Sequence, residues 1–193
     1  MEREGRGGQK DRLPPGQRLV VGWPVMTYGG TPVIPLERWR LRLFGAVERE
    51  VELSWEEFMA LPKTKLVCDI HCVTGWSRVG DEWEGVRAKD VVALCRPLPE
   101  AKAVMAHCYG GYTTNILLED LLLPDVLLAY RHNGKDLSPE HGWPVRLVVP
   151  HLYFWKSAKW VRALEFMTKD RPGFWEMYGY HMRGDPWREE RYA

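Results

Sequence analysis

The stretch KLVCDIHCVTGWSRVGDEWEGV, residues 65–86, holds two of the four cysteines of the chain and a histidine between them. Residues 65–73 are rich in apolar and β-branched side chains, which predicts a β-strand. Residues 75–85 are polar and contain three glycines, which predicts a loop. Cys72 therefore stands near the point where a strand ends, a position from which side chains often reach a ligand.

Outside this stretch, strand patterns outnumber helical ones. Strands are predicted over residues 39–45, 47–54, 101–108, 126–131 and 144–150, with a hairpin turn at Asn133 and Gly134. Short helices are predicted after the capping-box sequence SWEE (54–57), over 86–96 and near 117–122, while 156–167 fits a strand or a helix. The expected class is α+β, strand-rich with a mixed sheet and short helices.

The composition of the 193-residue chain is that of a globular protein with one domain, expected over residues 19–193 after a flexible arm at 1–18. A formal net charge of +1 gives no electrostatic reason to expect nucleic acid as a partner. The sequence shows no apolar stretch long enough to span a bilayer and no export signal, so we expect a cytoplasmic protein with reduced thiols.

The cysteines admit several interpretations. Cys68 and Cys72 lack the spacing of a zinc site or of a thioredoxin-like redox pair, and a strand would hold them roughly 13 Å apart, too far for a disulfide. Cys68 and Cys95 have apolar neighbours and are expected in the core. Cys72 remains either a ligand for a soft metal or a nucleophile, because spacing alone does not choose between the two.

Two separated segments, HCVTGWSRVGDEWEGV (71–86) and HGWPVRLVVPHLYFWKSAKWV (141–161), resemble the molybdopterin-binding domain of the sulfite oxidase family. The similarity extends over most of residues 20–180. It is strongest to small bacterial members, which include the catalytic subunit of periplasmic methionine sulfoxide reductases. The resemblance implies the mixed α+β fold of that family, with a molybdopterin cofactor that carries molybdenum.

The resemblance also implies roles for individual residues. Cys72 matches the single cysteine ligand of the molybdenum, whereas strand alternation turns His71 to the opposite face. The positions that match cofactor-binding residues of the family are Tyr28, Cys108 (or its neighbour Tyr109), His141, Arg146, Ser157, Ala158 and Lys159, with Lys156 a weaker candidate. Gly110 stands where many relatives have an aspartate, which leaves a backbone contact at this place.

The activity that the resemblance implies is two-electron oxygen-atom transfer on a small substrate, either sulfite oxidation or the reduction of a sulfoxide or N-oxide. An external one-electron carrier, such as a cytochrome or a haem- or quinone-linked protein, is the expected partner. Arg78, Trp76, Trp155 and Tyr153 are candidates for the substrate wall, and the aromatic tail FWEMYGYHMRGDPW (174–187) is interpreted as filling the edge of the core. The alternative is a non-enzymatic module, either stabilised by zinc or carrying a pterin.

Overall fold

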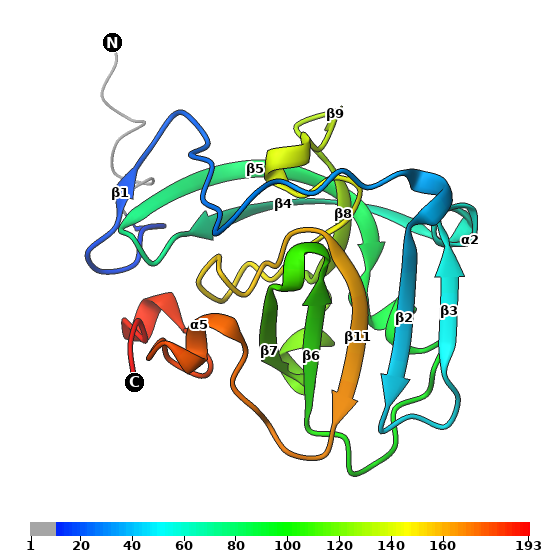
Figure 1. The fold of residues 1–193 in the computed structure, drawn as a ribbon. Helices are drawn as coiled ribbons and strands as arrows, with labels where there is room; N and C mark the ends of the chain where they lie inside the picture. Colours follow the sequence, from blue (N-terminus) through cyan, green and yellow to red (C-terminus); the bar gives the residue numbers. More distant parts are fainter. Residues whose placement is uncertain (1–10) are drawn as a thin grey trace.

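Two β-sheets pack against each other in the computed structural model of the chain, which describes residues 11–193 (Figure 1). The six-stranded sheet has the order β1 (Arg18–Leu19), β5 (Trp76–Arg87), β8 (Leu127–His132) and β10 (Arg146–Val148), with β4 (Lys63–His71) beside β5 and β9 (Lys135–Asp136) beside β8. The five-stranded sheet has the order β3 (Val51–Ser54), β2 (Arg40–Gly45), β11 (Val161–Met167), β6 (Ala103–Cys108) and β7 (Thr113–Leu117). Both are mixed sheets, since β1 runs parallel to β5 and β2 runs parallel to β11.

The helices of the described residues are short. They are α2 (Trp55–Ala60), α3 (Ala88–Val92), α4 (Leu118–Leu121) and α5 (Phe174–Met177), with 3₁₀ turns η1 (Leu36–Arg38), η2 (Tyr109–Gly111), η3 (Pro139–His141) and η4 (Pro186–Arg188). The capping box is confirmed, because Ser54 Oγ accepts from the Glu57 amide and Glu57 Oε2 accepts from the Ser54 amide. Across residues 11–193 we find no helix of the length and hydrophobicity needed to cross a membrane.

Alternation along β8 separates two apolar layers. Leu128 and Tyr130 face the main core, where they meet residues of the second sheet such as Leu41 of β2. Leu127 and Ala129 point the other way, into a smaller cluster on the outer face of the six-stranded sheet. This outer layer also contains Cys72, Trp76 and Trp83, with Trp23 and Phe154 packed against it. The candidate site therefore adjoins this outer layer.

The predicted loop at 75–85 is wrong, because these residues form most of β5. The strand pairs with β4 from Lys63 opposite Val86 to His71 opposite Ser77, with an irregular register between Cys68 and Ile70. Its glycines mark features within a strand. A side chain at Gly85 would overlap the Leu128 carbonyl of β8, at a second irregularity of the sheet.

Other predicted boundaries change in the same region. Residues 86 and 87 end β5, so the helix expected over 86–96 is reduced to α3. The ambiguous segment 156–167 becomes strand β11 only from Val161 onward. The hairpin turn is confirmed, with Asn133 and Gly134 both at positive φ between β8 and β9.

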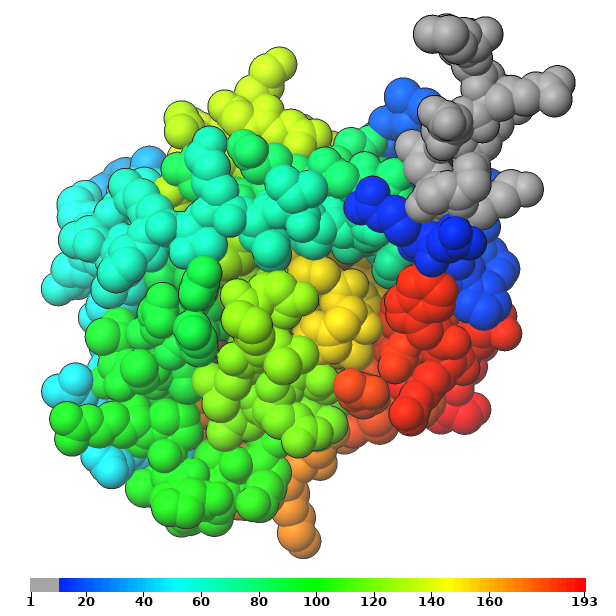
Figure 2. All heavy atoms as spheres, turned by 180° about the vertical axis from the view of Figure 1, so that it is seen from behind, coloured from blue at the N-terminus to red at the C-terminus, as the bar shows by residue number. Residues whose placement is uncertain are grey.

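The expected arm at 1–18 falls partly outside the described residues, which begin at 11. Residues 11–18 are attached to the domain: Arg12 pairs with Asp69, and Gln17 donates to the Cys72 carbonyl over 3.1 Å. Arg191, near the C-terminus, donates to the Pro15 carbonyl. Figure 2 shows the C-terminal residues in red packed beside the first described residues in blue. Both ends of the described part of the chain therefore lie near Cys72.

Candidate active site

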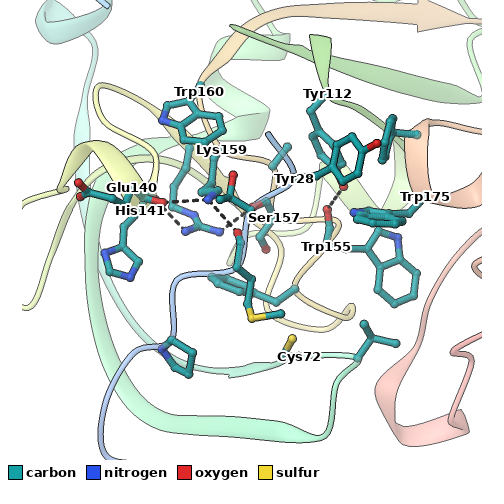
Figure 3. Close-up of a pocket in the computed structure, with 18 of the residues that line it drawn as sticks. Tyr28, Cys72, Tyr112, Glu140, His141, Trp155, Ser157, Lys159, Trp160 and Trp175 are labelled. Carbon is teal, nitrogen blue, oxygen red and sulfur yellow. Dashed lines mark hydrogen bonds between the residues drawn. The ribbon is translucent and has the colours of Figure 1, made fainter. Parts of the chain in front are cut away.

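A cavity of about 390 Å³ lies on the outer face of the six-stranded sheet and brings together segments distant in the sequence (Figure 3). Its lining residues fall within 23–28, 72–76, 110–112, 140–146, 154–160 and 174–180. All but one of the residues expected to bind the cofactor line it, namely Tyr28, Cys72, His141, Arg146, Ser157, Ala158 and Lys159. Cys108 does not.

Cys72 lies on the turn that joins β4 to β5. The Gly75 amide donates to the Cys72 carbonyl over 3.0 Å, and the Cys72 amide donates to Trp76 O over 2.8 Å. Gly75 has a φ of 94°, which only glycine adopts at little cost, so the turn is fixed on both sides of the thiol. The sulfur lies 3.2 Å from Thr74 Oγ1, and burial raises the pKa of the Cys72 thiol. Figure 3 shows it at the floor of the cavity.

The other groups of the CDIHC segment are turned away from the cavity. His71 is buried with its Nδ1 2.8 Å from Ser77 Oγ, and burial lowers its pKa to about 4, which keeps the ring neutral. Cys68 is half-buried and packs against the outer apolar layer, and Cys95 lies in the main core. Cys72 is thus the cysteine of this segment whose side chain lines the cavity.

Arg146 is a buried cation whose guanidinium lies over the rings of Phe154, Trp23 and Trp83, at 4.2 to 5.7 Å from their centroids. Its guanidinium donates to the carbonyls of His141 (2.8 Å) and Ser157 (2.7 Å), while Nε has no hydrogen-bond partner. No carboxylate of residues 11–193 forms a salt bridge with it, and burial lowers its pKa to about 9. A buried positive charge with a free donor fits an anionic ligand in the cavity.

Lys159 and His141 lie beside this guanidinium. Lys159 Nζ donates to the carbonyls of Met26 and Glu140, each over 2.8 Å, and burial lowers its pKa to about 8. The His141 ring stacks on Trp23 with centroids 3.8 Å apart, and burial and then Arg146 lower its pKa. This side of the cavity therefore presents two cations held by neutral carbonyl groups.

The segment after β6 does not meet the cavity as expected. Cys108, the last residue of β6, faces the main core, where burial raises its pKa, and Tyr109 also lies outside the lining. The lining here comes from Gly110, Gly111 and Tyr112. Both glycines have positive φ, and a Cβ on either would meet open space, so the backbone is accessible to a ligand. At this place the cavity is therefore lined by the next turn of the chain and not by Cys108.

Of the candidates for the substrate wall, only the two tryptophans, Trp76 and Trp155, line the cavity. Arg78 instead forms a two-point ion pair with buried Asp81, at 2.6 and 2.8 Å. Tyr153 stacks on Trp155 from outside the lining. Lys156, a weaker candidate for cofactor binding, is fully buried in an ion pair with Glu176.

Sequence reasoning missed the aromatic residues of the C-terminal segment. Phe174, Trp175 and Tyr180 line the cavity and do not merely fill the edge of the core. Gln17, from the expected arm, was also missed, although it accepts from Ser77 Oγ over 3.0 Å and holds the Cys72 carbonyl. The high tryptophan content, ten residues in one domain, was a signal for the aromatic residues. No sequence pattern indicated Gln17.

The zinc-stabilised alternative lacks its ligands. A structural zinc site takes four nitrogen or sulfur ligands. Within residues 11–193, no three His, Cys, Asp or Glu side chains are grouped to hold a metal ion. The cavity instead has one thiol and, beside it, cations that suit an anionic ligand. This combination fits a metal that is bound to an anionic organic cofactor.

Comparison with known proteins agrees with this chemistry. The family model described as the oxidoreductase molybdopterin binding domain matches residues 28–175. The uncharacterised oxidoreductase YuiH of Bacillus subtilis is 48% identical over 96% of this chain and 94% of its own length. The protein-methionine-sulfoxide reductase catalytic subunit MsrP of Campylobacter jejuni is 29% identical over 74% of this chain, which spans 53% of that relative.

A solved structure extends the comparison to the fold. The sulfane dehydrogenase SoxCD from Paracoccus pantotrophus superposes with a TM-score of 0.66 and 26% identity, covering 72% of this chain and 41% of that one. The expected fold is thereby confirmed, as are the enzyme class and the cofactor, molybdopterin with molybdenum. The chain belongs to the oxidoreductases that carry the molybdopterin-binding domain of the sulfite oxidase family.

Proposed function

We propose that the protein transfers an oxygen atom between water and a small sulfur- or nitrogen-containing substrate, at a molybdenum cofactor bound through the Cys72 thiolate. One observation carries the proposal: the Cys72 thiol and the buried Arg146 guanidinium, which forms no salt bridge with a described carboxylate, are far apart in the sequence but line the same cavity. The name of the methionine sulfoxide reductase relative supports a sulfur substrate, and that of a rice nitrate reductase, 25% identical over 78% of this chain, supports a nitrogen substrate.

In this proposal Cys72 is the protein ligand of the molybdenum. A thiolate suits a metal already bound by soft sulfur donors, and the turn closed by Gly75 fixes its direction. Thr74 Oγ1, at 3.2 Å from the sulfur, adjusts the electron density on the ligand through a hydrogen bond. When bound, the cofactor supplies the coupled exchange of two electrons and one oxygen atom.

Arg146 and Lys159 bind the anionic part of the cofactor. The free Nε of Arg146 offers a donor that no described protein group uses, and Lys159 adds a second charge. The positions of Ser157 and Ala158 are fixed through their carbonyls, which accept from Arg146 and from the Leu147 amide. The backbone of Gly110, which also lines the cavity, permits close approach of a ligand.

The reaction needs a partner that handles electrons. Reduction of an S-oxide consumes two electrons and two protons, breaks the S–O bond and releases a thioether and water. Oxidation of sulfite consumes water, forms one S–O bond and releases sulfate, two protons and two electrons. An external one-electron carrier exchanges these electrons in two steps. A small-molecule substrate and such a carrier are the partners that we propose.

The test uses protein produced in a molybdenum-replete host. We expect about one molybdenum per chain by elemental analysis, lost in Cys72→Ser and retained in Cys68→Ser, the matched control. Turnover is then measured for sulfoxides, N-oxides and nitrate with a reduced viologen donor, and for sulfite with an artificial acceptor. Zinc in place of molybdenum would contradict the proposal. Bound molybdenum without turnover of any of these compounds would favour the pterin-carrier alternative.

A further inference from the structure

A continuous set of aromatic rings lines the cavity on the side away from the cations. These residues, here called the aromatic wall, are Tyr28, Tyr112, Trp155, Phe174, Trp175 and Tyr180. In Figure 3, Tyr112, Trp155 and Trp175 lie on one side, His141 and Lys159 on the other, and Cys72 at the base between them. The cavity thus has a cationic side and an aromatic side.

The rings of the wall contact one another directly. Phe174 and Trp175 have centroids 5.0 Å apart, and Trp175 stacks on Tyr180 at 5.1 Å. Trp155 meets the same tyrosine edge-on at 5.1 Å, and Tyr28 meets Phe174 at 5.0 Å. These spacings are those of favourable aromatic pairs, so the wall is formed before any ligand binds.

A buried ion pair fixes the two tryptophans of the wall. Glu176, next to Trp175, lies 2.6 Å from Lys156 Nζ and accepts from Trp155 Nε1 over 2.8 Å. The side chains of Glu176 and Lys156 are fully buried. Gly173, directly before α5, packs so closely on Thr114 that a Cβ there would lie 2.6 Å from its Cα. Glu176 is therefore a positioning residue for the wall.

The wall offers no charge to a bound molecule. Lys156, the cation nearest to it in the sequence, is neutralised by Glu176 and lies outside the lining. Among the described residues, the lysine and arginine that line the cavity are Lys159 and Arg146, both of which face the cofactor in the proposed function. An inorganic oxyanion on the aromatic side would lose hydration against ring faces that carry negative potential.

We infer that the aromatic wall is the substrate subsite and that it takes an uncharged organic sulfoxide, or its thioether, with an apolar or aromatic substituent. The inference rests on the proposed function, since it names the substrate class of the same site. The sulfoxide gains two electrons from the external carrier and two protons, its S–O bond breaks, and thioether and water leave. Burial of the substituent against the rings then favours such compounds over nitrate or sulfite.

The test compares holoenzyme variants. Trp175→Ala removes the centre of the wall, Trp175→Phe keeps a ring there, and Trp187→Ala is the matched control, since Trp187 is half-exposed and outside the lining. We expect Trp175→Ala to lower kcat/KM for methyl phenyl sulfoxide about tenfold, with little change for dimethyl sulfoxide. Trp187→Ala should stay near the wild-type value, and Trp175→Phe should recover part of the loss.

A binding measurement separates this inference from the proposed function. Methyl phenyl sulfone, an analogue, is titrated calorimetrically into each holoenzyme of verified molybdenum content, with nitrate as the competitor. Binding of the sulfone that is about tenfold weaker to Trp175→Ala than to wild type and Trp187→Ala supports the aromatic wall. This holds even if no compound is turned over, a result that would contradict only the proposed function. Equal binding and equal kcat/KM in all variants would overturn the inference, as would tighter binding of nitrate than of the sulfone. If sulfoxides were still turned over in that case, the proposed function would stand.

Discussion

Replacing Glu176 with glutamine removes the only carboxylate within salt-bridge distance of Lys156 in the described part of the chain. Nζ and Oε1 are 2.6 Å apart, and neither side chain is exposed to solvent. The ammonium keeps its contacts with Asn115 and the Met182 carbonyl, but these groups are neutral. An uncompensated buried charge of this kind costs about 3–5 kcal/mol of stability.

In a domain of this size, that loss lowers the melting temperature by roughly 6–20 °C. The assay is thermal unfolding followed by circular dichroism at neutral pH. The control is Glu50→Gln, which breaks a solvent-exposed ion pair with Arg42 and should leave the melting temperature nearly unchanged.

The pH dependence gives a second readout. Burial already lowers the pKa of Lys156, and Glu176 opposes that shift, so the pKa falls further in Glu176→Gln. The unfolded chain then binds more protons than the folded one, and the stability of the variant rises towards about pH 10, which narrows its difference from wild type. A variant that melts within about 2 °C of wild type at neutral pH would refute this account of the pair.

Three further variants test other parts of the structure. Arg146→Met should lower the molybdenum content per chain at least about tenfold without unfolding the protein, because it removes a cation and not a packed apolar group. A normal molybdenum content would contradict the role of the guanidinium. Burial would raise the pKa of Asp120, but hydrogen bonds from His151 and Arg183 outweigh it and hold the pKa at about 2. Asp120 should therefore contribute about 2 kcal/mol to the free energy of unfolding, which is lost as the pH falls from about 4 to about 2. In urea titrations, Asp120→Asn should lose this part of the acid dependence. Gly85→Ala should cost about 3 kcal/mol or more, because its Cβ overlaps the Leu128 carbonyl, whereas Gly30→Ala, with open space around it, should be nearly neutral in the same titrations.

Local patterns sufficed for much of the fold. Alternating side chains identified β2, and short apolar runs identified β6, β8 and β10. The capping box and the hairpin turn lie where the sequence predicts them. The strand β5 was missed because its glycines serve a close approach to β8 and an irregular register, which depend on the neighbouring strand. Glycine signals a loop only when no such partner is present.

The site shows the same division. Cys72 and the segment 141–159 were identified because both match motifs of the family in the same order. The structure brings them to one cavity. Cys108 was misplaced because the end of β6 faces the core, which depends on how the two sheets pack. The C-terminal rings of the aromatic wall, Phe174, Trp175 and Tyr180, were missed because the position of their segment depends on the buried pair of Lys156 and Glu176.

The central claim is that the Cys72 sulfur binds the molybdenum. X-ray absorption at the molybdenum edge counts sulfur neighbours directly, in wild type, in Cys72→Ser and in the control Cys68→Ser. Wild type and Cys68→Ser should give the same count, and any metal retained by Cys72→Ser should have one sulfur neighbour fewer. An unchanged count in Cys72→Ser, or a loss in Cys68→Ser instead, would contradict the assignment of Cys72 as the ligand.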